Sequence, residues 1–391
     1  MVKSVTFLHI YLIKEDNLKD ITLMVLCAGN SSRFEFITKK QWLRVGDIPL
    51  WLFVTNRLKN FYNFKQIIVV GHNEEINYMK KFDTSFSFVS GGNTRQNSIK
   101  NGLQEVTTKY VMVTDVARSC VPKKIIKNLI KNRKKASCIV PALDVSDTVI
   151  FKNDTINRDE VKLIQTPQLS KTKILKEALK TKKEFTDDSS AIKAFGGKIF
   201  YIKGSQKSTK LTFGKELKTV KCLKKPSKDF FTGIGIDIHQ FEENKPMVLG
   251  GVKIESDFGF KAHSDGDVAI HSIIDAILGA ANGGDIGEFF PDNDSRYKNA
   301  DSKELLKYIV KFISNIGFSI VNIDLTILAQ TPKINPYKQN MQKSLSKLLN
   351  IPQYKINIKA TTAENMGFIG RKEGVMVQSI ATLKYTNWIK K

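Results

Sequence analysis

The first half of the chain alternates short apolar runs with segments of helical periodicity. The apolar runs have the length and composition of buried strands, and they lie at residues 21–27, 66–71, 110–114 and 137–141. The segments between them repeat apolar residues every three or four positions, and they lie at residues 50–59, 94–105 and 123–132. Strands that alternate with helices predict an α/β domain whose largely parallel sheet is covered on both faces. Ligands of such a domain bind beyond the carboxyl ends of the strands.

The pattern changes near the basic segment 222–228, where Pro226 disfavours a helix immediately before it. Beyond it, strands are expected from residue 230 and at 321–329, 354–360 and 375–385, with helices at 267–281, 302–316 and 336–349. This mixture predicts an α+β domain. We therefore expect an N-terminal extension (1–20), a first domain (21–221), a linker (222–229) and a second domain (230–391).

Length and charge narrow the functional class. At 391 residues the chain is longer than one ordinary domain, which agrees with two. The net charge is +24, but its lysines are scattered along amphipathic segments, without an Arg-rich tract or interleaved aromatic residues. We therefore expect no nucleic-acid partner. A nucleic-acid-binding protein remains the alternative, and it would show salt-sensitive duplex binding. A positive field also attracts anionic phosphate substrates.

The beginning of the chain carries a short apolar run at residues 5–13. His9 interrupts this run, and Lys14-Glu15-Asp16 follows it in place of a small-residue cleavage site, so we interpret it as an extension. No apolar run reaches the length of a membrane span. We expect a cytoplasmic protein without a membrane partner.

The sharpest compositional signal is a cluster of histidines. Of the five histidines in the chain, three lie between residues 239 and 271. Asp237 and His239 are two positions apart, so they project from the same face of a strand. His271 lies on a predicted helix and can complete a zinc site with one carboxylate and two imidazoles. Asp267 and Asp275 lie one turn to either side of it, and we expect one of them to orient an imidazole. The alternative is an ordinary helix start with Ser264 and Asp265 as caps.

Further motifs accompany this cluster. They are Gly284-Asp-Ile-Gly287, Phe290-Pro-Asp292, Ala329-Gln-Thr-Pro-Lys333, Lys359-Ala-Thr-Thr-Ala-Glu364 and Gly367-Phe-Ile-Gly-Arg371. With the histidines they resemble 2-C-methyl-D-erythritol 2,4-cyclodiphosphate synthase, from about residue 230 to the end. The resemblance implies Asp237, His239 and His271 as zinc ligands and Glu364 as a magnesium ligand. It also implies that His263 and Thr362 are catalytic, stabilising the transition state.

The same resemblance implies a set of substrate contacts. Asp285 would bind the ribose, the loop 290–294 would cover the methylerythritol, and the segment 329–335 would hold cytosine. The implied contacts are Ser264, Asp285, Gly287, Asp292, Ala329, Lys333, Thr361, Phe368 and Arg371. One departure is Ala363, where the family usually has a third threonine. The implied reaction closes a cyclic diphosphate and releases CMP, which requires positioning and charge neutralisation more than covalent help.

The first domain carries polar loops after its predicted strands. Residues 26–34 read Leu-Cys-Ala-Gly-Asn-Ser-Ser-Arg-Phe, a small-residue loop whose N–H groups can approach a triphosphate, while Arg33 adds charge. An ordinary βα turn is the alternative for this loop. Asp115 follows a buried strand and suits magnesium, and Arg118 suits phosphate. Other polar motifs are Lys39-Lys40-Gln41, Gly91-Gly-Asn-Thr-Arg-Gln-Asn-Ser98, Thr166-Pro-Gln168 and Thr186-Asp-Asp188.

Together these motifs resemble 2-C-methyl-D-erythritol 4-phosphate cytidylyltransferase over about residues 20–220. The resemblance implies a Rossmann-like nucleotidyltransferase domain that joins CTP to methylerythritol phosphate and releases pyrophosphate. The implied catalytic residues are Arg33, Lys40, Arg158 and Lys210, with Arg158 reaching across a dimer. The implied substrate contacts are Ala28, Gly29, Arg95, Ser98, Asp115, Arg118, Thr166 and Thr186. Asp115 would also contact Mg²⁺, with Mn²⁺ as a substitute in either domain.

Some positions depart from the transferase pattern. Leu26 and Cys27 stand where the family favours Pro-Ala, and Asn93 where an acidic residue is common. Lys207 stands where an aspartate often provides a second magnesium contact. We expect a bifunctional enzyme of the non-mevalonate isoprenoid route, acting on CTP, methylerythritol phosphate and its cytidine diphosphate derivative. In the alternative, only the synthase is active and the first half is a degenerate nucleotide-binding or assembly module. The resemblance implies synthase trimers and transferase dimers, which a hexamer satisfies.

Overall fold

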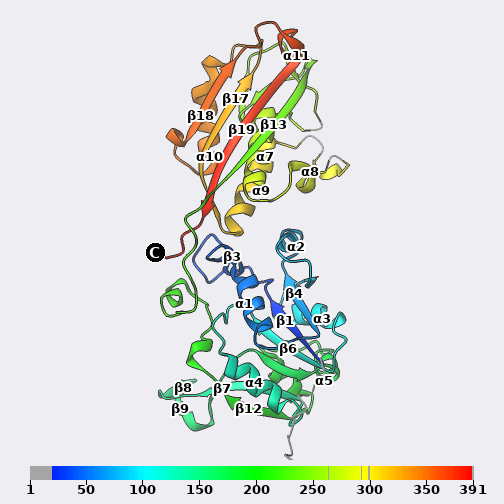
Figure 1. The fold of residues 1–391 in the computed structure, drawn as a ribbon, viewed down its shortest axis with the longest axis vertical. Coiled ribbons are helices and arrows are strands. Elements are labelled where there is room, and N and C mark those ends of the chain that lie inside the picture. Colours follow the sequence, from blue (N-terminus) through cyan, green and yellow to red (C-terminus); the bar gives the residue numbers. More distant parts are fainter. Residues whose placement is uncertain (1–19, 263, 292, 298–299, 390–391) are drawn as a thin grey trace, which may run out of the picture. The chain divides into compact units, whose positions relative to one another are not determined.

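The computed structural model describes residues 20–262, 264–291, 293–297 and 300–389 (Figure 1). Contacts divide the chain into two compact units. The first comprises Gly29 and the described residues before it together with Val54–Thr209; the second comprises Asn30–Phe53 together with the described part of Lys210–Lys391. Among the described helices, none combines the length and the apolar character that a bilayer crossing requires.

The first unit is built on a sheet with the strand order β10-β7-β11-β6-β1-β4-β5, in which β12 also pairs with β7. Strands β1, β4, β5 and β6 pair in parallel, as do β7 and β12, which confirms the expected largely parallel sheet. The strands are β1 (Ile21–Leu26), β4 (Gln66–Gly71), β5 (Ser87–Ser90), β6 (Tyr110–Asp115), β7 (Cys138–Asp144), β10 (Lys162–Ile164), β11 (Gln168–Lys171) and β12 (Ile199–Lys203). The antiparallel strand β11 was not anticipated, because it is short and no helical crossover precedes it.

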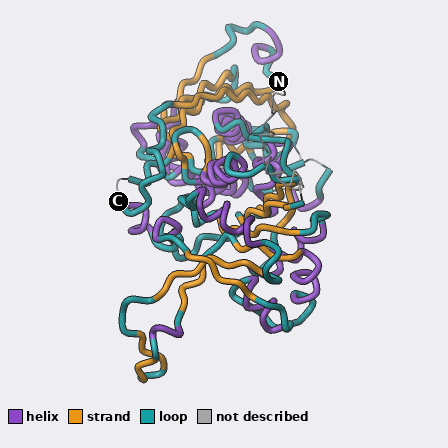
Figure 2. The backbone as a smooth tube through the Cα atoms, turned by 60° about the horizontal axis from the view of Figure 1, so that its bottom comes forward, coloured by secondary structure: helices purple, strands orange, loops and turns teal. Residues whose placement is uncertain are grey.

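Helices and an arm complete this unit. The helices are α1 (Leu50–Lys59, which crosses the boundary between units), α2 (Asn73–Lys80), α3 (Arg95–Gln104), α4 (Lys123–Asn132), α5 (Thr172–Ala178) and α6 (Asp188–Ala194). Helix α4 buries Ile125, Ile126 and Leu129 and exposes its lysines, which is the periodicity expected of it. The hairpin β8 (Val149–Phe151) and β9 (Asp154–Ile156) lies on a projecting arm, visible in Figure 2, on which Ile150 and Phe151 are exposed.

The second unit contains a mixed sheet with the order β16-β13-β19-β17-β18. Its members are β13 (Phe230–Glu243), β16 (Phe258–Phe260), β17 (Phe318–Leu328), β18 (Ile356–Thr361) and β19 (Gly374–Tyr385), and a hairpin is formed by β14 (Met247–Leu249) and β15 (Val252–Ile254). The helices are α7 (Val268–Ala280), α8 (Ile286–Phe289), α9 (Ser302–Asn315), α10 (Lys338–Leu349) and α11 (Gly367–Gly370). Helix α7 packs on β13 and β19 and is buried almost throughout.

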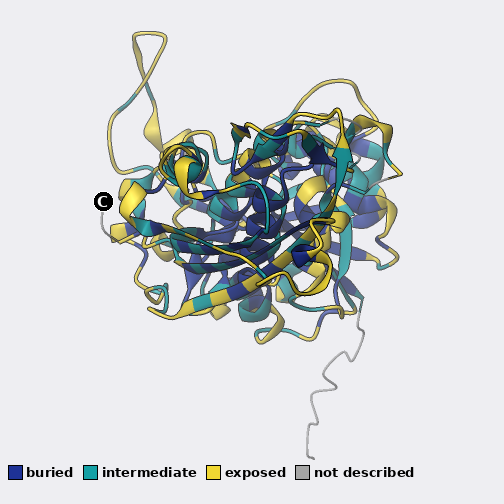
Figure 3. Cartoon of the chain, turned by 90° about the horizontal axis from the view of Figure 1, so that it is seen from above, coloured by how far each residue is buried: buried dark blue, intermediate teal, exposed yellow. Residues whose placement is uncertain are grey.

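The two faces of β13 differ in burial. Figure 3 shows how buried and exposed residues are distributed over the chain as a whole. Gly233 and Gly235 are buried towards α7, whereas Ile234, Ile236 and Ile238 on the other face are 60%, 51% and 50% exposed. The described residues of one copy therefore leave this apolar strand face largely exposed.

The second unit also includes residues from early in the sequence. The segment 30–53 forms a short 3₁₀ turn at Lys40–Trp42 and the paired strands β2 (Arg44–Val45) and β3 (Ile48–Pro49). Gly46 in their turn pairs with the predicted linker, since its N–H donates to Lys225 O at 3.1 Å and Ser227 N–H donates back at 3.2 Å. No local pattern in the sequence indicates this grouping.

Candidate functional site

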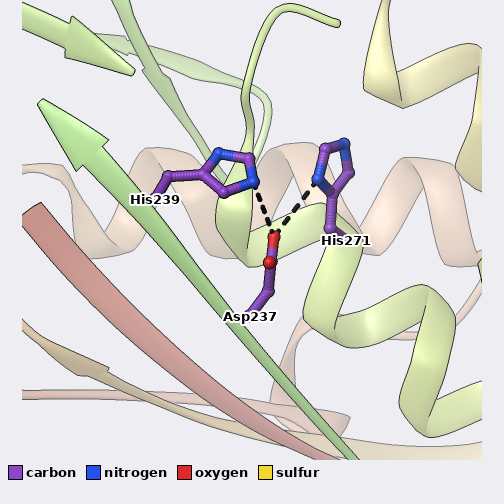
Figure 4. A group of neighbouring side chains, drawn as sticks. All are labelled: Asp237, His239 and His271. Atoms are coloured by element: carbon purple, nitrogen blue, oxygen red, sulfur yellow. Dashed lines mark hydrogen bonds and ion pairs between the residues drawn. The ribbon is translucent and has the colours of Figure 1, made fainter. Parts of the chain in front are cut away.

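Three side chains converge at the β13–α7 contact. Asp237 and His239 project from one face of β13, and His271 lies in the first part of α7 (Figure 4). Asp237 Oδ2 lies 3.1 Å from His239 Nε2 and 3.2 Å from His271 Nδ1. Ligand atoms of the three residues lie within 4.8 Å of one another, which is compatible with one metal ion. The expected cluster is therefore present in the described structure.

Glycines in β13 make this convergence possible. A Cβ on Gly235 would lie 2.6 Å from Ala276 N and would overlap Ser272 O, both in the backbone of α7. A Cβ on Gly233 would overlap Ala276 O in the same way. Because both positions lack a side chain, α7 lies directly against the strand and His271 reaches Asp237.

Neighbouring groups fix the imidazole rings. Nδ1 of His239 donates a hydrogen bond to the carbonyl oxygen of Gly266 at 3.0 Å, which leaves Nε2 facing Asp237. Nε2 of His271 lies 2.9 Å from Ser302 Oγ, and that hydroxyl donates to Asp265. Such contacts orient metal-binding imidazoles and select their tautomer.

The expectation that Asp267 or Asp275 orients an imidazole is wrong. Asp267 is the N-cap of α7, and its carboxylate accepts from the N–H groups of Gly250 (2.8 Å), Gly251 (2.6 Å) and Ile270 (3.0 Å). Asp275 accepts from Ile286 N–H at 2.8 Å. An N-cap side chain turns back to its own helix, so the Asp267 carboxylate points away from the ring nitrogens. The cap of α7 is therefore Asp267 and neither Ser264 nor Asp265.

The three residues influence one another electrostatically. Burial would raise the pKa of Asp237, but hydrogen bonds from His239 and His271 outweigh it and hold that pKa far below its usual value. Burial would lower the pKa of His239, but the hydrogen bond and charge of Asp237 raise it above its usual value. The cluster therefore keeps Asp237 in its ionised form, and a bound cation would stabilise the same form.

A cavity of about 500 Å³ opens beside the cluster. His239 and His271 line it together with two predicted substrate contacts, Ser264 and Gly287, and with Lys261, which the sequence did not single out. Asp285 lies nearby in sequence as the N-cap of α8, where it accepts from Glu288 N–H at 3.1 Å. His263 and Asp292 lie outside the described residues.

The other predicted synthase residues form a second group at the ends of β17 and β18. Ala329 N–H donates to Thr361 O at 3.0 Å, and the Thr362 hydroxyl donates to Glu364 Oε1 at 2.6 Å. Among described residues, this group does not contribute to the 500 Å³ cavity lining. Of the remaining predicted residues, Lys333 follows β17 in the chain, Phe368 lies in α11, and Arg371 ends that helix and donates to Glu373 Oε1 at 2.7 Å.

In the first unit, several predicted transferase residues contact one another. Arg95 begins α3 and donates through Nε to Asp115 Oδ1 at 3.1 Å and through Nη1 to Asp188 Oδ1 at 2.8 Å. Burial would lower the pKa of Arg95, but the charges of Asp188 and Asp115 raise it well above its usual value. The N–H of Asp115 donates to the Thr166 hydroxyl oxygen at 3.3 Å.

Asp188 is an addition to the predicted set. Burial raises its pKa despite the opposing charge of Arg95. The sequence showed it only as part of the Thr186-Asp-Asp188 loop, in which Thr186 is exposed and Asp187 caps α6.

Other predicted transferase residues belong to the same unit but not to the group around Arg95. Gly91 brings Ala28 and Ser98 together, because a Cβ there would overlap Ala28 Cβ and lie 3.1 Å from Ser98 Oγ. Arg118 donates to Ser208 O at 2.6 Å and to Ile164 O at 3.2 Å, and it lines a cavity of about 410 Å³. Gly29 ends the first stretch of this unit. Arg158 lies on the arm and donates to Ser146 O at 2.7 Å.

Three predicted transferase residues belong instead to the second unit: Arg33, Lys40 and Lys210. Arg33 and Lys210 are exposed. Lys40 lies with its Nζ 5.2 Å from the centre of the buried Phe34 ring, and its N–H donates to Ser31 Oγ at 2.9 Å. Lys207, the main departure from the family pattern, is exposed.

Comparisons with known proteins cover both halves. Residues 21–223 match the family model for 2-C-methyl-D-erythritol 4-phosphate cytidylyltransferase, and residues 230–384 match that of the YgbB family. The bifunctional enzyme IspD/IspF of Aliarcobacter butzleri is 64% identical over 372 residues, which cover 95% of this chain and 100% of the relative. The relative of the same description from Campylobacter fetus is 53% identical, covering 94% and 98%. The solved structure of the bifunctional IspDF from Campylobacter jejuni is 50% identical with a TM-score of 0.85, covering 95% of this chain and 100% of that one.

Proposed function

The chain belongs to the bifunctional IspD/IspF family, and we propose that its two halves catalyse two reactions of non-mevalonate isoprenoid biosynthesis. The first half transfers CMP from CTP to 2-C-methyl-D-erythritol 4-phosphate and releases pyrophosphate. The second cyclises 4-diphosphocytidyl-2-C-methyl-D-erythritol 2-phosphate to the 2,4-cyclodiphosphate and releases CMP. Both family matches support this account, and nothing favours a degenerate first half.

The observation that carries the second reaction is the cluster of Asp237, His239 and His271. Its donors are one carboxylate and two imidazoles held by neighbouring groups, a set that fits zinc with a coordination position left for substrate. Bound zinc would polarise a substrate phosphate as a Lewis acid. Glu364 is our candidate ligand for Mg²⁺, because carboxylate oxygens are the ligands that this ion prefers.

In the cyclisation, an oxygen of the 2-phosphate attacks the β-phosphorus of the diphosphate, the bond from that phosphorus to the CMP oxygen breaks, and CMP leaves. Ser264 and Gly287 line the cavity in which this substrate would bind, and Lys261 adds positive charge to it. We assign the ribose to Asp285 and the stabilisation of the transition state to His263 and Thr362. Asp292, Ala329, Lys333, Thr361, Phe368 and Arg371 complete the proposed substrate contacts.

For the first reaction, an oxygen of the substrate phosphate attacks the α-phosphorus of CTP, and pyrophosphate leaves. Two polyanions must approach each other, so cations are needed to offset their repulsion. We assign this role to Arg33, Lys40, Arg158 and Lys210, and Mg²⁺ to Asp115. The pairing of Arg95 with Asp115 and Asp188 supports a fixed polar site at the carboxyl end of β6. Ala28, Gly29, Ser98, Arg118, Thr166 and Thr186 complete it.

We further propose a homo-oligomer. The apolar face of β13, with Ile234, Ile236 and Ile238, is left exposed by the described residues of one copy, and a second copy would cover it. Among the described residues of one chain, those that line the cavity beside His239 do not include the group around Glu364. This separation is expected if each synthase active site forms between two copies. Trimeric synthase contacts and dimeric transferase contacts would together give a hexamer.

The assignment is tested by supplying each half with its own substrate. Purified full-length protein with CTP, Mg²⁺ and methylerythritol phosphate should release pyrophosphate, and Lys40→Ala should abolish this release. The same wild-type protein should release CMP from the cytidine diphosphate ester that carries a 2-phosphate. Pyrophosphate release that survives in Lys40→Ala would refute the transferase assignment, and absence of CMP release would refute the synthase assignment.

A further inference from the structure

The end of helix α9 presents carbonyl groups that lack the regular helical hydrogen bond, of which Ser314 O also accepts locally from Gly317 N–H at 3.2 Å. The last four C=O groups of an α-helix have no partner further along the helix and must be satisfied elsewhere. Helix α9 ends at Asn315, with Ile316 as C-cap and Gly317 in the left-handed region at φ +94°. Leu306, Ile309 and Ile313 are fully buried, so this helix is firmly held in the second unit.

The segment around Lys40 pairs with these carbonyls. The Thr38 hydroxyl donates to Ser314 O at 3.1 Å, and the N–H of Lys39 donates to Asn315 O at 3.0 Å. The two residues directly before Lys40 are therefore both fixed to the end of α9. Thr38 is buried, so water does not compete for its bond.

Arg44, which follows Lys40 in the sequence, also contacts the end of α9. Its guanidinium donates through Nη2 to Ile316 O at 3.2 Å and lies 5.1 Å and 4.7 Å from the ring centres of Phe318 and Tyr385. A cation is favoured at the negative end of a helix, and a guanidinium stacks well on aromatic rings. Arg44 is almost completely buried, so each of these contacts is shielded from solvent.

Two further contacts tie this arrangement to residues late in the sequence. Trp388 Nε1 donates to the carbonyl oxygen of Arg44 at 2.7 Å. A Cβ on Gly317 would lie 2.8 Å from Trp42 O, so the backbones approach more closely there than any other residue type permits. The Lys40 segment is thus enclosed by residues of α9, β17 and the chain after β19.

We propose that the end of helix α9, acting through Thr38 and Arg44, positions Lys40 for cytidyl transfer. The synthase half would thereby support a catalytic residue of the transferase half, while Arg44 itself does not touch substrate. This inference rests on the proposed function, since Lys40 takes its role from it. The fusion of the two halves would then affect cytidyl transfer directly, without passage of a substrate from one active site to the other.

The test uses the full-length protein and the variants Thr38→Val and Arg44→Met. Thr219→Val is a matched control, because the Thr219 hydroxyl also donates to a backbone carbonyl, that of Glu216 at 2.8 Å, which is not part of α9. For each protein, kcat and the KM values for CTP and for methylerythritol phosphate are measured, together with CMP release by the synthase and the melting temperature.

We expect Thr38→Val and Arg44→Met to lower kcat/KM for CTP by roughly ten- to a hundredfold, as displacement of a catalytic group by about 1 Å does. KM for methylerythritol phosphate, CMP release and the behaviour of Thr219→Val should stay at wild-type values. Unchanged kcat/KM for CTP overturns the proposal. So does a parallel loss of both activities with a lower melting temperature, which indicates a purely structural role. If the wild-type protein does not release pyrophosphate, the proposed transferase function itself is refuted. This result is distinct from failure of the positioning proposal, in which the wild-type protein is active and the variants match it.

Discussion

Ser302 Oγ lies 2.9 Å from Nε2 of His271, the ring nitrogen opposite the one that faces Asp237. Ser302 is the first residue of α9 and is fully buried, and its hydroxyl donates to Asp265. The chain Asp265–Ser302–His271 therefore fixes the ring orientation that a metal ligand needs.

Ser302→Ala should lower zinc affinity by about ten- to a hundredfold, the usual cost of losing a group that orients a ligand. Competition with a chromogenic chelator measures this affinity directly. Ser346→Ala is the control, since Ser346 donates to Ile351 O at 2.6 Å in a helix away from the cluster. Equal zinc affinity in Ser302→Ala and wild type would show that the hydroxyl does not orient the ring.

Gly235→Ala should abolish zinc binding and lower the melting temperature, because the new methyl group would displace α7 from β13. Gly279→Ala is a matched control on α7: its Cβ would lie 3.7 Å from the nearest atom, Gly233 Cα. Alanine is favoured over glycine within a helix by about 1 kcal/mol, so this control should be at least as stable as wild type. The account fails if both variants retain zinc equally.

Arg95→Met should lower the free energy of unfolding by about 3–5 kcal/mol, because it leaves the buried Asp188 carboxylate without its positive partner. Burial already raises the pKa of Asp188, and removal of Arg95 raises it further. A carboxyl group with a raised folded-state pKa contributes stability below its unfolded pKa, near 3.9, and loses it as the pH rises through the folded value.

The loss of stability in Arg95→Met should therefore be larger at neutral pH than in mild acid, as measured by urea unfolding at both. Lys162→Met removes the exposed pair with Asp144 and should cost under about 1 kcal/mol. A loss that is independent of pH would contradict an ionised, unpaired Asp188 in the variant.

Ile236→Glu should dissociate the proposed oligomer, because it places a charge in the apolar face of β13. Sedimentation should show a smaller particle, and CMP release should fall while pyrophosphate release continues. Tyr354→Glu is the control, as Tyr354 is 83% exposed but lies outside β13. Unchanged particle size in Ile236→Glu would place the oligomer contact elsewhere.

The sequence was most informative where structure is local. Helices α1 and α4 have the predicted bounds, since apolar spacing reports which face of a segment is buried. Asp237 and His239 were placed on one strand face because alternation of side chains depends on backbone geometry alone. The clustering of histidines suggested His271 as the third ligand, and the family resemblance then implied the same set.

What the sequence did not reveal depends on contacts between distant residues. Ser302 is one serine among many until α9 places it beside His271. Asp188 gains its importance from Arg95, which lies on another helix. The docking of Thr38 and Arg44 on the end of α9 has no local signature, because it depends on how carbonyls more than 270 positions away are exposed.

We expect one chain to carry two separable reactions, of which only the cyclisation depends on the cluster around His239. The most direct measurement is made on His239→Ala, by determining bound zinc, CMP release and pyrophosphate release in one preparation. We expect this variant to lose both zinc and CMP release and to release pyrophosphate at the wild-type rate. Wild-type CMP release from His239→Ala, or loss of both activities in a protein that remains folded, would contradict it.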